Sequence, residues 1–212
     1  MIGLQNEGTP MTLQRLSDPQ LAAATAVYTR AFMDDPISIW IAPDPAQRER
    51  SLPLYFRMAM QYALRFGGQV HRSDDSPRAV ATWLEPGRSP PSTIGLLRTG
   101  FLRLLWSGGL TDARRLLTLG DTFDRLHKQD MTQAHWYLWL LAVDPPFQGK
   151  GLGGDLLGPA LHEADRARLP CYLETARERN VSFYMRFGFR VLRDERMGRD
   201  GPRFWTLLRT PG

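Results

Sequence analysis

Hydrophobic residues recur along the chain at two spacings, one typical of helices and the other typical of strands. Spacings of three and four residues predict helices over residues 18–33, 45–66, 92–106, 111–128, 150–168 and 180–187. Alternation and short uncharged runs rich in β-branched or aromatic residues predict strands over residues 11–16, 69–72, 78–84, 135–143, 171–175, 189–197 and 203–209. This order of elements predicts an α/β fold, or α+β in some schemes.

We expect one domain over residues 11–212, preceded by a disordered leader over residues 1–10. Residues 88–130 read as an inserted helical pair, because their pattern is helical on both sides of Gly108-Gly109. The apolar stripe of the first inserted helix could cover a substrate pocket, contact a second subunit or lie on a membrane. Simple packing against the domain is the favoured interpretation for the stripe residues Ile94, Leu97, Phe101, Leu104 and Leu105.

Composition narrows the class of protein. The chain has 212 residues, of which 42% are hydrophobic, so it can bury a full core as one domain. No stretch approaches the roughly 18 uninterrupted apolar residues of a membrane span. The first residues lack the basic start and apolar centre of a signal peptide, so we expect a cytoplasmic protein. The single cysteine, Cys171, leaves no internal disulfide and no cysteine pair for structural zinc, and it is interpreted as a core strand residue.

The formal net charge is +5, and the arginines are spread along the chain without forming one basic block. Most of this charge is interpreted as solvated surface, and no nucleic-acid partner is expected. A modest positive field would also help to capture an anionic ligand. Nucleic-acid binding stays a competing hypothesis, and it predicts affinity that falls steeply with salt.

The most informative motif is a glycine-rich loop, residues 148–153, between a predicted buried strand and a predicted helix. Glycines let the main chain approach an anion, and a helix N-terminus supplies unpaired N–H groups, so the order predicts a polyphosphate site. The loop is not a P-loop, because Gly151-Leu152 stands where Lys and Ser or Thr are needed. Its glycine spacing does not fit a dinucleotide fingerprint either.

Gln148, Gly151 and Gly153 match the Gln/Arg-x-x-Gly-x-Gly/Ala signature of the GNAT family of acetyl-CoA-dependent N-acetyltransferases. A second stretch, with residues 172–175, Asn180, Phe183-Tyr184 and residues 187–189, is similar to that family's next motif. The resemblance covers about residues 134–208. The residues of these motifs are most similar to those of puromycin N-acetyltransferase and its relatives. The resemblance implies the GNAT fold, with a mixed central sheet of six to seven strands, flanking helices and, here, a helical insertion.

The resemblance also implies acetyl-CoA as the acetyl donor. The transfer reaction that it implies requires no metal. Loop amides would hold its pyrophosphate, Gln148 would shape the loop, and Lys150 could add charge. In the family the strand before the loop separates from its neighbour, and its main chain pairs with the pantetheine arm. The residues so implied in cofactor binding are Leu141, Ala142, Val143, Gln148, Gly149, Lys150, Gly151, Leu152, Gly153, Gly154 and Asn180.

Two residues are candidates for proton transfer. Tyr184 lies one helical turn beyond Asn180, and in the family this tyrosine is often assigned to protonating the departing thiolate. The alternative is a buried tyrosine with a satisfied hydroxyl, and Asn180 could bind the cofactor or cap its helix. Glu174 is the general-base candidate, and a carboxylate that merely fixes a neighbouring loop is the rival interpretation.

Other reactive or aromatic side chains receive less specific interpretations. The four histidines lack a motif context and are taken as structural or surface residues: His71, His127, His135 and His162. Strand aromatics could line an aromatic acceptor pocket, although such residues are usually core: Trp83, Tyr137 and Trp139. A covalent acetyl-enzyme through Cys171 lacks a histidine placed to activate it, so direct transfer is favoured.

The leading hypothesis is an N-acetyltransferase that moves an acetyl group directly to the amine of a small molecule. One alternative is a non-catalytic acyl-CoA-binding sensor or interaction module that uses the helical insertion as its contact surface. Protein N-terminal acetylation is another. A homodimer is possible, and no membrane span is expected.

Overall fold

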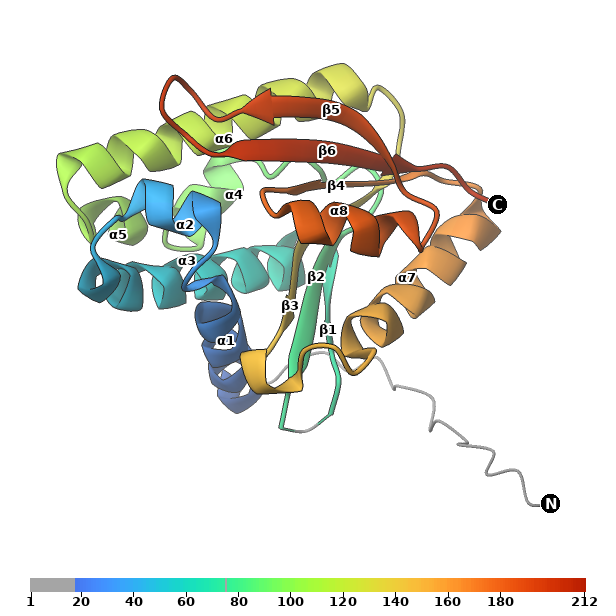
Figure 1. Ribbon diagram of the computed structural model, residues 1–212, viewed down its shortest axis with the longest axis horizontal. Coiled ribbons are helices and arrows are strands. Elements are labelled where there is room, and N and C mark those ends of the chain that lie inside the picture. The colour runs from blue at the N-terminus through green and yellow to red at the C-terminus, as the bar shows by residue number, and fades with distance from the viewer. Residues whose placement is uncertain (1–17, 75) are drawn as a thin grey trace.

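A computed structural model describes residues 18–74 and 76–212 and has a six-stranded mixed sheet with helices on both faces (Figure 1). This is the mixed α/β architecture that the sequence predicts. The predicted leader and the predicted strand over residues 11–16 lie outside the described residues. In chain order the elements are α1 (Asp18–Phe32), α2 (Pro36–Ile41), α3 (Pro45–Phe66), β1 (Gly68–Arg72), β2 (Ala79–Leu84), α4 (Thr93–Arg98), α5 (Phe101–Trp106), α6 (Leu110–Asp130), β3 (Trp136–Val143), the 3-10 helix η1 (Pro145–Phe147), α7 (Leu152–Ala167), β4 (Cys171–Thr175), α8 (Glu178–Met185), β5 (Arg190–Arg196) and β6 (Arg203–Arg209).

The strand order is β1-β2-β3-β4-β6-β5, and every neighbouring pair is antiparallel except β3 and β4. That parallel pairing covers only three positions, from Trp136 opposite Cys171 to Leu138 opposite Leu173. Beyond it, residues 140–143 pair with β2 alone. The sheet therefore opens into two halves. One half contains β1, β2 and β3, the other contains β4, β6 and β5, and their strands run in different directions in Figure 1.

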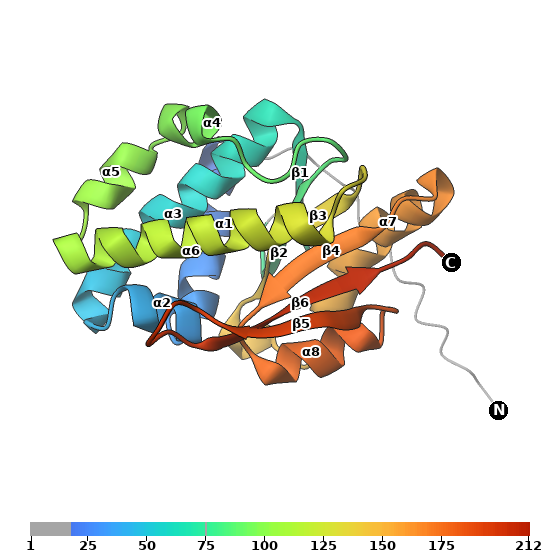
Figure 2. The same ribbon diagram turned by 90° about the horizontal axis from the view of Figure 1, so that it is seen from above.

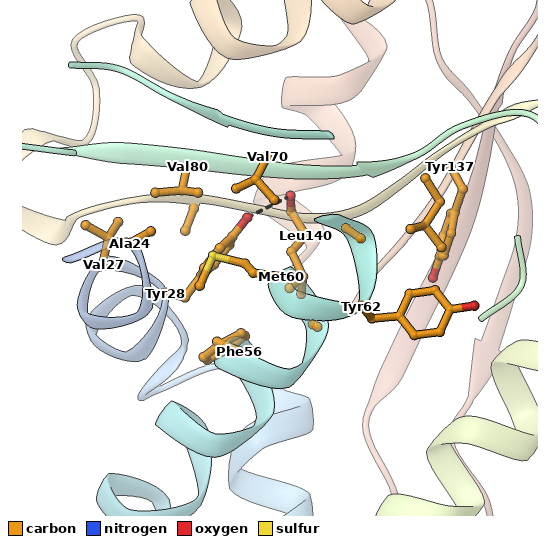
Figure 3. Packing of buried hydrophobic residues seen from close by; sticks show 14 of the residues in the cluster. Ala24, Val27, Tyr28, Phe56, Met60, Tyr62, Val70, Val80, Tyr137 and Leu140 are labelled. Atoms are coloured by element: carbon orange, nitrogen blue, oxygen red, sulfur yellow. Dashed lines mark hydrogen bonds between the residues drawn. The ribbon is translucent and has the colours of Figure 1, made fainter. Parts of the chain in front are cut away.

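Helices α1 and α3 cover one face of the first half-sheet (Figure 3). Tyr28 of α1 is fully buried, and its ring stacks on Phe56 of α3 with centroids 5.1 Å apart. Its hydroxyl lies 2.8 Å from Thr82 Oγ1 and donates to the Leu140 carbonyl oxygen at 3.3 Å. The buried hydroxyl is thus satisfied by the two central strands, which ties α1 to them.

Helices α7 and α8 cover the opposite face. The helix predicted after the glycine loop is confirmed, and its inner face packs against Trp83, Trp136 and Leu173. The buried stripe residues of α7 are Leu156, Leu157, Ala160, Leu161 and Ala164. Cys171 is buried in this cluster, as expected of a core strand residue.

Helix α6 lies across the second half-sheet on the α1 side. Figure 2 shows it passing over β3 and β4, with its far end near α5 and α2. Asp130, at its C-terminal end, accepts hydrogen bonds from Tyr172, Arg193 and Thr206 on three different strands. Helix α6, the second of the two predicted inserted helices, therefore packs on the domain.

Two details differ from the sequence-based prediction. The predicted helix over residues 92–106 is wrong as one element, since Gly100 adopts φ +109° and separates α4 from α5. Its predicted stripe is also only partly covered: Leu104 is buried, while Ile94 and Leu97 are exposed. Helix α2 was not predicted, because six residues are too few to show a period.

Among the described residues, no helix is long and apolar enough to cross a membrane.

Buried His71 on β1 should make stability depend on pH. Burial lowers the pKa of His71 from 6.5 to about 4, so below pH 6.5 the unfolded chain takes up the proton first. Stability should fall as the pH drops from 6.5 toward 4, with a contribution from His71 of up to about 3 kcal/mol. Urea unfolding at several pH values should show a flatter profile for His71→Leu. The control His162→Gln changes an exposed histidine on α7 and should keep the original slope; an equal slope in both variants contradicts the assignment.

Candidate active site

Two cavities meet in the opening between β3 and β4. The first, here called the loop cleft, has a volume of about 380 Å³ and lies between the end of β3, the glycine loop and α8. The second, here called the helix cavity, has a volume of about 150 Å³ and lies between β3 and helices α2, α3, α5 and α6. Five residues line both cavities and define their junction: Phe32, Asp35, Leu141, Asn180 and Tyr184.

The structure brings most of the predicted cofactor residues together around the loop cleft. Two of them lie elsewhere. Lys150 is exposed and its Nζ lies 5.2 Å from the centre of the Phe147 ring, and Gly154 packs against Phe187. The predicted residues that line the cleft are Leu141, Ala142, Val143, Gln148, Gly149, Gly151, Leu152, Gly153 and Asn180.

The backbone of the glycine loop explains why glycine is needed there. Gly149 and Gly151 have φ values of +78° and +86°, which side chains disfavour. Gly151 is the N-cap of α7, so the loop leads directly into a helix N-terminus with its unpaired N–H groups. Gln148 Nε2 donates to the Val143 carbonyl oxygen at 3.0 Å and closes the loop onto the end of β3.

The two cavities differ in charge. Among the residues that the structure describes, three arginines and one carboxylate line the loop cleft: Arg177, Arg179, Arg186 and Asp35. The helix cavity is lined mainly by apolar side chains and by three carboxylates, and no Lys, Arg or His among the described residues lines it. An anion is therefore favoured on one side of the junction and a cation with an apolar body on the other. The three carboxylates are those of Asp35, Asp112 and Glu174.

Tyr184 stands at the junction and is almost completely buried. Burial raises the pKa of Tyr184 above its ordinary value, so the phenol keeps its proton at neutral pH. Asn180 lies one turn earlier and its Nδ2 donates to Thr175 Oγ1 at 3.1 Å. The capping alternative for Asn180 is wrong, because α8 begins at Glu178 with Arg177 as its N-cap.

Asp35 is a junction residue that the sequence analysis did not single out. It caps α2 by accepting from the Ile37 N–H at 3.0 Å, and Arg177 Nε donates to its other oxygen at 3.2 Å. Burial raises its pKa, and these two partners oppose the rise. The sequence signal was Asp35-Pro36, a capping residue followed by proline at the first helical position.

Glu174 lies one residue beyond the last β3–β4 pair and lines the helix cavity. The Tyr137 hydroxyl donates to its Oε2 at 2.8 Å. Its Oε1 is buried without a hydrogen-bond partner and lies 3.8 Å from Nδ1 of His127. The interpretation of His127 as a residue without a site context therefore missed this contact, since 47 positions separate the two residues.

The aromatic residues proposed for an acceptor pocket divide between two places. Tyr137 and Trp139 line the helix cavity, whereas Trp83 packs in the core on the α7 face. The alternation of side chains along a strand accounts for this difference.

Comparisons with known proteins agree with this geometry. Residues 116–189 match the sequence model of the acetyltransferase (GNAT) family. An uncharacterized N-acetyltransferase of Schizosaccharomyces pombe is 27% identical over 186 residues, which cover 84% of this chain and 74% of that protein.

Solved structures share the fold. A histone acetyltransferase HPA2 and related acetyltransferase from Corynebacterium glutamicum superposes with a TM-score of 0.68 and 21% identity, covering 95% of this chain and 96% of that chain. Arylalkylamine N-acetyltransferase 2 from Aedes aegypti superposes with a TM-score of 0.58 and 14% identity, covering 95% and 99%. The chain therefore has the GNAT fold. The finer resemblance to puromycin N-acetyltransferases stays a prediction.

Replacing Gly151 by alanine should weaken coenzyme A binding. Gly151 has a left-handed φ, and an alanine in this conformation is less stable by about 1 kcal/mol or more. The variant should therefore populate the loop conformation less. Isothermal titration calorimetry with coenzyme A should then show about fivefold lower affinity. Gly158→Ala is the matched control, since Gly158 lies on the same helix with open space around it. Equal affinities for both variants would contradict a role for the loop conformation.

Proposed function

We propose that this chain is an acetyl-CoA-dependent N-acetyltransferase that acetylates the amine of a small molecule with an apolar body. The observation that carries the proposal is the meeting of two oppositely charged cavities at Tyr184, inside the opening of a GNAT-fold sheet. The GNAT domain match and the curated relative support the reaction class.

The loop cleft suits the phosphates and pantetheine arm of acetyl-CoA. The glycine loop offers an N–H-rich helix start to a pyrophosphate, and Arg177, Arg179 and Arg186 supply positive charge around it. Residues 141–143 have no strand partner on the β4 side, so their main chain can pair with an amide-containing arm. Acetyl-CoA would supply the reactive acetyl thioester at the junction.

The helix cavity suits the acceptor. Its apolar walls match a hydrocarbon or aromatic body, and its carboxylates attract an ammonium group. Most of its helical walls come from α2, α3, α5 and α6, with α1 and α8 at the junction, which favours a small molecule over the N-terminus of a protein.

Two side chains would handle the protons of direct transfer. Glu174 accepts a proton from the amine, and the neutral Tyr184 phenol donates its proton to the sulfur as the thiolate leaves. Cys171 does not support a covalent route, because it lines neither cavity and burial raises the pKa of its thiol to about 12.

A thiol-release assay with acetyl-CoA tests the function. We expect release that depends on an aromatic or aliphatic monoamine, such as 2-phenylethylamine, and that exceeds release with spermidine or with an octapeptide carrying a free N-terminus. Faster release with the peptide would support protein N-terminal acetylation. Binding of acetyl-CoA by calorimetry without release for any acceptor would support the sensor alternative.

Tyr184→Phe should lower turnover on the order of a hundredfold or more, because the leaving thiolate loses its proton donor. The KM for acetyl-CoA should change little, since the ring stays in place. Tyr62→Phe is the control: Tyr62 is a buried tyrosine whose hydroxyl accepts from the Ser92 N–H outside both cavities. Unchanged turnover in Tyr184→Phe would remove this residue from the acid role.

A further inference from the structure

Exposed hydrophobic side chains are concentrated on three consecutive helices, α4, α5 and the first half of α6. Of the ten large hydrophobic residues that are exposed in the described part of the chain, six lie between residues 94 and 117. Trp106 and Leu110 are 86% and 89% exposed, so the rest of the domain leaves them almost uncovered. The six residues, here called the insertion patch, are Ile94, Leu97, Leu102, Trp106, Leu110 and Leu117.

The opposite faces of these helices pack on the domain. Gly95 of α4 lies against the ring of Tyr62 on α3. Leu104 of α5 is buried in one cluster with Leu116 and Leu119 of α6. Helix α5 contacts both α4 and α6, and the three helices follow one another along one edge of the molecule in Figure 2. The insertion patch therefore lies on the outward side of one continuous run of helices.

Each of these helices also exposes one arginine, three or four positions away from a residue of the insertion patch. This spacing places the arginine and the apolar side chain on the same face of the helix. The three arginines are Arg98, Arg103 and Arg114. No carboxylate in the described ranges, 18–74 and 76–212, forms an ion pair with them. Between residues 88 and 118 the one carboxylate in the sequence is Asp112, which lines the helix cavity.

Unpaired positive charge beside apolar side chains selects the kind of partner. A two-fold pair of identical chains would set this positively charged surface against itself, without carboxylates to oppose the arginines. An anionic lipid bilayer instead offers phosphates to the arginines and hydrocarbon to the apolar side chains. Tryptophan is also a preferred side chain at the boundary between lipid headgroups and acyl chains. Charge complementarity therefore favours an anionic lipid surface.

The insertion patch is next to the acceptor side of the candidate active site. Leu105, Ser107 and Asp112 line the helix cavity. Trp106 and Leu110 lie between these residues in the sequence and face outward. A surface held against the ends of α5 and α6 would therefore lie beside the helix cavity.

We propose that the insertion patch docks this chain on an anionic lipid surface. Trp106 and Leu110 insert among the lipids, and Arg98, Arg103 and Arg114 contact the headgroup phosphates. Docking requires neither acetyl-CoA nor an acceptor, so it is independent of the proposed function. It brings the helix cavity to the lipid surface.

Co-sedimentation with lipid vesicles tests the docking. The full chain should sediment with vesicles that contain phosphatidylcholine and phosphatidylglycerol in equal amounts, and it should stay in solution with phosphatidylcholine alone. Binding should fall as salt is added, because salt screens the arginines from the headgroups. Absence of binding to the anionic vesicles would overturn the proposal.

Substitutions locate the contact on the protein. Trp106→Ser should weaken binding to the anionic vesicles about tenfold or more, and Arg103→Gln about fivefold. The matched controls are Met185→Ser, an exposed apolar residue of α8, and Arg166→Gln, an exposed arginine of α7. Both controls should bind like the unmodified chain. Unchanged binding in Trp106→Ser, or an equal loss in the controls, would show that the contact lies elsewhere and would overturn the proposal.

Fluorescence reports on the inserted side chain itself. Trp106 is the one mostly exposed tryptophan among the six in the sequence, all of which the structure describes. The emission of the unmodified chain should therefore shift to shorter wavelength when anionic vesicles are added. Trp106→Phe should remove this shift and keep most of the binding. A shift of the same size in Trp106→Phe would contradict insertion of Trp106.

Light scattering decides whether a second copy covers the insertion patch instead. We expect the same mass for the unmodified chain and for Trp106→Ser. A dimer that Trp106→Ser converts to a monomer would overturn the lipid proposal in favour of self-association. Circular dichroism checks that the variants fold. If no amine supports thiol release, the proposed function fails, whereas the vesicle measurements still decide the docking.

Discussion

The site depends on the early end of hydrogen bonding between β3 and β4. Three paired positions hold the two strands together, and beyond Leu138 and Leu173 the strands separate. An unpaired strand edge inside a protein leaves backbone N–H and C=O groups without hydrogen-bond partners. The opening is therefore stable only where another molecule binds to these groups. The separation also lets Glu174 of β4 and Tyr184 of α8 line the same cavity.

Several side chains hold the two halves of the sheet in this arrangement. Tyr28 anchors α1 to β2 and β3, and Arg30 extends this anchor by a bidentate ion pair with Asp144 at 2.9 and 2.7 Å. On the other half, Asp130 joins the end of α6 to β4, β5 and β6. The opening is therefore bordered by rigid elements on both sides, which favours a site already formed before ligands bind.

Local sequence patterns predicted the strand, the glycine loop and the helix that border the loop cleft. The strand, the glycine loop and α7 follow one another along the chain, and the left-handed φ of Gly149 and Gly151 is the reason for glycine there. The acceptor side was much less predictable, since its walls come from α2, α3, α5 and α6. Helix α2 is too short to show a period, and the contact of His127 with Glu174 depends on how α6 crosses the sheet.

Helix α6 contributes to two parts of the site. Its middle, at Leu116 and Leu119, forms a wall of the helix cavity, and its last turn carries His127. A tilt of α6 that widened the helix cavity would therefore also move His127 away from Glu174.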